Sequence, residues 1–82
     1  MALKLVFLGR LEDTAGTAEL LIDLPKPQSL AQLFARLDGA VGAALAGERV
    51  KLALNGALVG YRPDLMVSDG DELAFLPPVS GG

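Results

Sequence analysis

The segment SLAQLFARLDG, residues 29–39, predicts the main helix of this chain. Its apolar residues recur at intervals of three and four, which is typical of one face of an α-helix; they are Leu30, Leu33, Phe34 and Leu37. Ser29 is a good N-cap, because its side chain can accept a hydrogen bond from a free N–H of the first turn. Gly39 is suited to end the helix. We therefore expect an amphipathic helix that must cover an apolar surface.

Short segments on both sides of this helix alternate in polarity, with the period of two that half-buried strands show. We predict strands over residues 3–9, 18–24, 50–54 and 72–76, a short return strand at 57–59, and a short strand or turn at 65–67. The side chains predicted to face the helix are Leu3, Leu5, Phe7, Leu20, Ile22, Leu24, Val50, Leu52, Leu54, Leu73 and Phe75.

The connections between these strands carry recognisable turn residues. Asn55–Gly56 is a strong hairpin signal, because both residues tolerate a positive φ. Residues 10–17 are interpreted as a turn that joins the first two strands into a hairpin. A short helical turn is expected near residues 43–45. Pro77 cannot donate a ladder hydrogen bond, so the last strand is expected to end there.

The resulting order, two strands, one helix and two strands, predicts an α+β fold with a mixed sheet and one main helix packed across one face. With 82 residues the chain is expected to form one small domain, over residues 1–76. Residues 77–82 are predicted to be a projecting tail.

Composition excludes several classes of chemistry. The chain has no Cys and no His, so disulfides and thiolate or imidazole metal sites are excluded, as are the usual nucleophile–base pairs. Its net charge of −3 argues against nucleic acid as a partner. No apolar run is long enough to span a membrane, and residues 1–13 lack the features of a signal peptide. A cytoplasmic protein is expected.

The acidic segment DGDE, residues 69–72, does not have the spacing of a calcium-binding loop. It is interpreted as a tight turn with solvated acids. Glu12 and Asp13 are interpreted in the same way, and Tyr61–Arg62 as part of a loop.

The last six residues, PPVSGG, are the most unusual feature of the sequence. Pro77 and Pro78 favour an extended, projecting segment. Gly81 and Gly82 would let the backbone enter a channel that is too narrow for any Cβ atom. The group presented at the tip is then the α-carboxylate of Gly82, which can serve as a reagent although the usual catalytic side chains are absent.

The segment DGDELAFLPPVSGG, residues 69–82, resembles the C-terminal signature of the small subunit of molybdopterin synthase. That family consists of ubiquitin-like β-grasp sulfur carriers. KLVFLGRLEDTAG, residues 4–16, is similar to the family's first strand and turn, and LALNG, residues 52–56, to its hairpin. Residues 25–49 carry no motif beyond the helix, and Leu76 stands where many members have Phe.

The resemblance implies a reaction cycle and a set of partners. An adenylating enzyme similar to ubiquitin-activating enzymes would form an acyl-adenylate at Gly82, and a sulfur donor would convert it to a thiocarboxylate. The chain would then donate this sulfur to a pyranopterin precursor within the large subunit of molybdopterin synthase, as part of a heterotetramer. It would hold no permanent cofactor, since Gly82 carries AMP and then sulfur only transiently, and it would not be catalytic alone.

The sheet face opposite the helix is predicted to be a docking surface, because it is more apolar than solubility requires. Alternation places Val6, Leu8, Leu21, Ala53, Ala74 and Leu76 there, beside Lys4, Arg10 and Lys51. The alternative is that loops of the same chain cover this face. Partner contacts are expected at Val6, Leu8, Arg10, Leu76, Pro77, Pro78, Val79 and Ser80.

Two other functions remain open from the sequence. The chain could be a sulfur carrier for thiamine or cysteine synthesis, although the double proline before the tail favours molybdopterin synthase. It could also be a β-grasp interaction module with an incidental tail.

Overall fold

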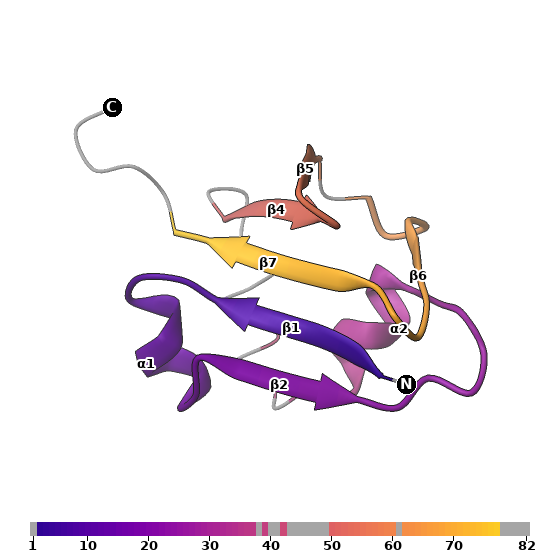
Figure 1. Ribbon diagram of the computed structural model, residues 1–82, viewed down its shortest axis with the longest axis horizontal. Helices are drawn as coiled ribbons and strands as arrows, with labels where there is room; N and C mark the ends of the chain where they lie inside the picture. Colours follow the sequence, from indigo (N-terminus) through magenta and orange to yellow (C-terminus); the bar gives the residue numbers. More distant parts are fainter. Residues whose placement is uncertain (1, 38, 40–41, 43–49, 61, 78–82) are drawn as a thin grey trace.

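The main element of the fold is a five-stranded mixed sheet with the order β2-β1-β7-β4-β5 (Figure 1). The computed structural model describes residues 2–37, 39, 42, 50–60 and 62–77. The strands of this sheet are β1 (Leu3–Phe7), β2 (Glu19–Ile22), β4 (Lys51–Leu54), β5 (Ala57–Val59) and β7 (Glu72–Leu76). β1 runs parallel to β7, and the other neighbouring strands are antiparallel.

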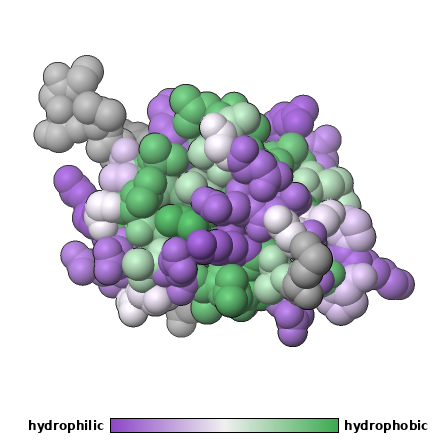
Figure 2. Space-filling view, viewed as in Figure 1, coloured by the Kyte–Doolittle hydropathy of each residue, from purple (hydrophilic) through white to green (hydrophobic). Residues whose placement is uncertain are grey.

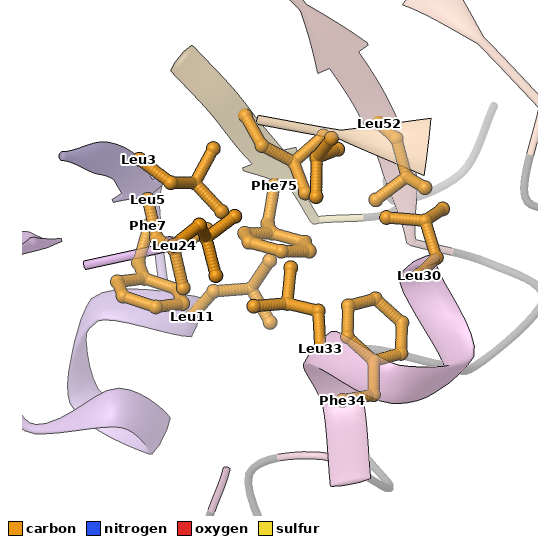
Figure 3. Close-up of a cluster of buried hydrophobic side chains, with 12 residues drawn as sticks. Leu3, Leu5, Phe7, Leu11, Leu24, Leu30, Leu33, Phe34, Leu52 and Phe75 are labelled. Atoms are coloured by element: carbon orange, nitrogen blue, oxygen red, sulfur yellow. The ribbon is translucent and has the colours of Figure 1, made fainter. Parts of the chain in front are cut away.

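One face of the sheet is covered by α2 (Leu30–Ala35), which lies behind the strands in the view of Figure 1. Side chains of both layers meet in an apolar core (Figure 3). The core residues are Leu3, Leu5, Phe7, Leu11, Leu24, Leu30, Leu33, Phe34, Leu52, Val67, Leu73 and Phe75. The predicted α+β class and the predicted contact between helix and sheet are therefore confirmed.

Phe75 of β7 is the aromatic centre of this core. Its ring stacks on that of Phe7, with ring centroids 5.4 Å apart and planes inclined by 9°. The Phe34 ring of α2 packs against it from the helix layer, with centroids 5.9 Å apart and an angle of 47°. Phe75 of the last strand thus contacts both the first strand and the helix.

The start of α2 is as predicted, and its end is not. Ser29 is the N-cap and forms a capping box with Gln32, in which each side chain accepts a hydrogen bond from the other residue's backbone N–H. The helix ends at Ala35 with Arg36 as C-cap, so Gly39 does not end it. Leu37 still packs against the core as a partly buried residue. The helical turn expected near residues 43–45 lies outside the described residues.

The segment interpreted as a turn between the first two strands contains a helix instead. α1 (Leu11–Ala15) buries Leu11 in the core and ends at Gly16, whose φ of 79° makes it a left-handed C-cap. The prediction of a simple turn was wrong because Leu11 is buried in the core and holds a helical turn there. The turn residues around it gave no indication of this burial. The antiparallel pairing of β1 with β2 is confirmed.

A second, two-stranded sheet was not predicted. β3 (Gln28–Ser29) pairs with β6 (Met66–Val67), and Val67 is fully buried. Leu30 N–H also donates to the Leu65 carbonyl at 2.9 Å. These bonds tie the start of α2 to the segment before β7.

The Asn55–Gly56 hairpin is confirmed, with φ of 51° at Asn55 and 87° at Gly56 between β4 and β5. Asn55 also contacts the acidic turn before β7. Its Nδ2 donates to Asp71 Oδ1 at 3.0 Å, and its Oδ1 accepts from the Glu72 N–H at 2.9 Å. The hairpin is thereby fixed to the start of the central strand.

The acids of residues 69–72 are not merely solvated, which corrects the prediction. Asp69 Oδ1 accepts a hydrogen bond from the Leu24 N–H at 2.7 Å, across 45 residues of sequence. Asp71 Oδ2 accepts from the Ser68 N–H at 2.9 Å and closes the turn. Both carboxylates satisfy backbone donors that the strands leave unpaired.

Leu20 does not reach the core, although alternation assigns it to the inner face. It lies opposite Leu5 in the register, but its side chain remains 38% exposed. β2 is an edge strand, and the helix layer covers the inner face of that edge only in part.

Replacing Leu33 with Ala should lower the free energy of unfolding by about 2–5 kcal/mol, because a fully buried side chain between α2 and the sheet is removed. Leu58→Ala deletes the same atoms on β5, where the side chain is 75% exposed, and should cost less than about 0.5 kcal/mol. Urea denaturation of both variants measures the difference. Equal losses would contradict the assigned core face.

Candidate functional site

None of the described elements covers the sheet face opposite α2, and Figure 2 shows this face with hydrophobic and hydrophilic residues interspersed over the strands. The register aligns one row across all five strands: Glu19, Val6, Ala74, Ala53 and Leu58. Four of these five residues are apolar, so the middle of the open face is an apolar strip. We call this row the central row.

A second row lies at the end of the sheet from which the tail leaves. Leu76 of β7 lies opposite Lys51 of β4. On its other side is Leu8, which continues the β1–β7 pairing by donating its N–H to the Phe75 carbonyl at 3.1 Å. Leu8 is 42% exposed, and Leu76 is half-buried. We call these three residues the tail-side row.

The opposite end of the open face is polar. Lys4 lies between Leu21 of β2 and Glu72 of β7 in the register. Its Nζ lies 3.2 Å from Glu19 Oε2, with both side chains substantially exposed, so this pair contributes little to stability. The apolar part of the face therefore lies in the central and tail-side rows.

The structure brings together the predicted partner residues that it describes. Val6 lies in the central row, and Leu8 and Leu76 lie in the tail-side row. Arg10 is exposed at the N-cap of α1, two residues after Leu8. The half-buried Pro77 follows directly after β7. Among the described residues, the predicted face is not covered by loops: Leu21 is 67% exposed, and Leu58, which the prediction missed, is 75% exposed.

Leu58 could have been found from its register. The sequence predicts a short return strand at 57–59 without assigning its faces. Pairing across the Asn55–Gly56 turn places Leu58 opposite Ala53, which was assigned to the outer face. The two-residue hairpin therefore fixes Leu58 on that face as well.

The interior of the described domain contains no buried polar or charged side chain. No group of three or more acidic residues in the described part of the chain is placed to hold a metal ion. None of the described helices is long and apolar enough to cross a membrane. The predicted catalytic residues Gly81 and Gly82, and the predicted partner residues Pro78, Val79 and Ser80, lie outside the described residues.

Comparison with known proteins assigns the family. A model described as the ThiS family matches residues 5–82. The chain belongs to the ThiS family. It is 34% identical over 82 residues to the molybdopterin synthase sulfur carrier subunit of Escherichia coli, an alignment that covers 98% of this chain and 99% of the relative. The ThiS family is one of ubiquitin-like sulfur carriers, so the resemblance found in the sequence is confirmed.

Solved structures confirm the β-grasp fold. SAMP1 of Haloferax volcanii superposes with a TM-score of 0.75 over 100% of both chains, at 23% identity. A complex of subunits 1 and 2 of the molybdopterin-converting factor of Helicobacter pylori contains a chain that superposes with a TM-score of 0.68 over 100% of both chains, at 26% identity. In that relative, subunits 1 and 2 form a protein–protein complex.

Proposed function

We propose that this ThiS-family chain is the sulfur carrier subunit of molybdopterin synthase. The observation that carries the proposal is the 34% identity, over nearly the full length of both chains, to a molybdopterin synthase sulfur carrier subunit. The double proline and double glycine at residues 77–82 support it, because they are the motif on which the resemblance to this subunit rests. In this proposal residues 1–76 are the folded carrier and residues 77–82 its reactive tail.

The chemistry takes place at the Gly82 carboxylate. A carboxylate oxygen attacks the α-phosphorus of ATP within an adenylating enzyme, pyrophosphate leaves, and an acyl-adenylate forms. The terminal sulfur of a persulfide donor then attacks the acyl carbon, and AMP leaves. A thiol cleaves the resulting S–S bond, so that the thiocarboxylate remains on the carrier. The thiocarboxylate is a far better nucleophile than the original carboxylate, and it transfers its sulfur to a pyranopterin precursor.

The carrier holds no cofactor between these steps, since Gly82 carries AMP and then sulfur only transiently. The partners are the adenylating enzyme, the sulfur donor and the large subunit of the synthase, with which the chain forms a heterotetramer. Because these steps consume ATP, the proposal places the cycle in the cytoplasm. The large subunit supplies the active site, so the carrier is not an enzyme by itself.

The open sheet face is the proposed docking surface for the large subunit. Its central and tail-side rows expose apolar side chains next to the point where the tail begins, and Arg10 lies beside them. Docking through Val6, Leu8 and Leu76 would direct the tail toward the partner. Pro77, Pro78, Val79 and Ser80 would then line the path to its active site. The complex of subunits 1 and 2 in the Helicobacter pylori relative supports binding to a second subunit.

Deleting Gly82 should abolish sulfur loading, because it moves the carboxylate back by about 3.5 Å, farther than an aligned attack tolerates. Gly81→Ile should also fail, since a branched Cβ would occupy the narrow channel. Wild type, incubated with the activating enzyme, ATP and a sulfur donor, should gain the mass of one oxygen exchanged for one sulfur. Intact-mass spectrometry measures this exchange, and the absence of Cys keeps the assignment simple.

Ala35→Gly is the control for these tail variants, because it changes an exposed residue on the helix side and should load normally. Thermal unfolding should show that all variants fold. If the chain lacking Gly82 is loaded as well as wild type, the tail is not the reagent and the proposal is wrong.

Leu76→Asp should weaken binding to the large subunit at least tenfold, because it replaces one of the two leucines of the tail-side row with a charged residue. The fold should persist, since the new carboxylate would lie opposite Lys51. Ala31→Asp adds the same charge on the exposed side of α2 and should bind like wild type. Isothermal titration calorimetry compares the three chains. Equal affinity of both variants would place the docking surface elsewhere.

A carrier for thiamine or cysteine synthesis would show the same loading at Gly82, so the acceptor must be tested separately. The loaded chain should form pyranopterin dithiolene only with the large synthase subunit. Sulfur transfer to a thiazole precursor or to an activated serine derivative instead would assign it to one of those pathways. A β-grasp interaction module would not be loaded at all.

A further inference from the structure

The parallel ladder between β1 and β7 ends at a defined hydrogen bond. The ladder begins where Lys4 donates its N–H to the Asp71 carbonyl at 2.9 Å. Its last bond is the one in which Leu8 donates its N–H to the Phe75 carbonyl at 3.1 Å. In a parallel pair, a residue that donates to one partner residue accepts from the residue two positions further along. The Leu8 carbonyl would therefore accept from residue 77. That residue is Pro77, which has no N–H to donate.

The Leu8 carbonyl is satisfied from within its own segment instead. Leu11 donates its N–H to it at 3.1 Å, as the chain turns into α1. This bond depends on the chain reversing at Gly9, whose φ of 57° lies in the left-handed region that favours glycine. The sheet thus ends at this point on both strands: β7 cannot donate further, and β1 has already turned away.

Gly9 also makes space for Pro77. A Cβ atom built on Gly9 would lie 2.8 Å from Pro77 Cγ and 3.6 Å from Pro77 Cδ. Ordinary contact begins at 3.4 Å, so the ring would have to move by about 0.6 Å. The ring of a proline is closed onto its own backbone nitrogen, so any displacement of the ring beyond a change of pucker moves the start of the tail. Gly16, which also has a positive φ, has nothing within 4 Å of such a Cβ.

We propose that Gly9 is a positioning residue for the tail: its missing side chain seats the Pro77 ring against the end of β1 and so sets where the tail leaves the sheet. This inference rests on the proposed function, because it concerns delivery of the Gly82 carboxylate to the enzyme that loads it with sulfur. A displacement of about 1 Å in the placement of reactants can cost up to about 100-fold in rate, so a shift at the start of the tail is expected to slow loading.

The test compares Gly9→Asn with Gly16→Asn. Asn tolerates the left-handed conformation better than other residues with a Cβ, so the backbone cost is small and similar at both positions. Only the first variant pushes on Pro77. We expect Gly9→Asn to slow sulfur loading at saturating carrier about tenfold, and Gly16→Asn to load within twofold of wild type. Thermal unfolding of both variants shows whether each is folded at the assay temperature.

A second pair of variants separates positioning from a general structural effect. In the Pro77→Ala background the ring is gone, so Gly9→Asn should slow loading by no more than a further twofold. A loss caused only by a weakened fold would have the same size in both backgrounds. If Gly9→Asn is unfolded, Gly9→Ala carries the same Cβ and takes its place in both comparisons.

The outcomes are distinct. Failure of wild type to gain sulfur refutes the proposed function, and this inference with it. Normal loading of wild type together with normal loading of Gly9→Asn refutes the inference alone, as does a loss of equal size with and without the Pro77 ring. A tenfold loss that disappears when the ring is removed supports it.

Discussion

The parallel pairing of β1 with β7 is the contact on which the rest of this structure depends. It places the first and last strands side by side at the centre of the sheet, in a register that sets Phe7 opposite Phe75. Parallel strands require a long crossover connection, and α2 lies within that connection and packs Phe34 on Phe75. One register therefore determines which side chains form the core and where the chain leaves the sheet.

This register also separates the two faces of a small domain. Leu5, Phe7, Leu73 and Phe75 alternate with Val6 and Ala74, so the inner residues enter the core while the outer ones form the apolar central row. A single sheet with one helix layer can cover only one face. The outer face combines small apolar residues with charged ones, and under the proposed function this mixture allows it both to be stable in water and to bind a partner.

Much of this arrangement could be predicted from local patterns, because the residues concerned act through their immediate neighbours. Ser29 caps a helix, Asn55–Gly56 closes a hairpin, and alternation assigns the faces of β1, β4 and β7. The failures concern contacts distant in sequence. α1 exists because Leu11 finds a place in the core, β3 pairs with β6 across the start of α2, and Asp69 binds the Leu24 N–H. None of these partners is visible within a window of ten residues.

The site shows the same division between local and distant information. The tail motif and the apolar outer face could be read from the sequence, since each is a property of a continuous segment or of a simple period. The contact between Pro77 and Gly9 could not be read from the sequence, because the two residues lie 68 positions apart. Neither is distinctive alone, since glycine occurs in many turns and proline ends many strands. The two residues meet because the β1–β7 register places the residue after β7 beside the turn after β1. The register that forms the core thus also fixes where the chain leaves the sheet at Pro77, so the stability of the domain and the proposed positioning of its tail depend on the same pair of strands.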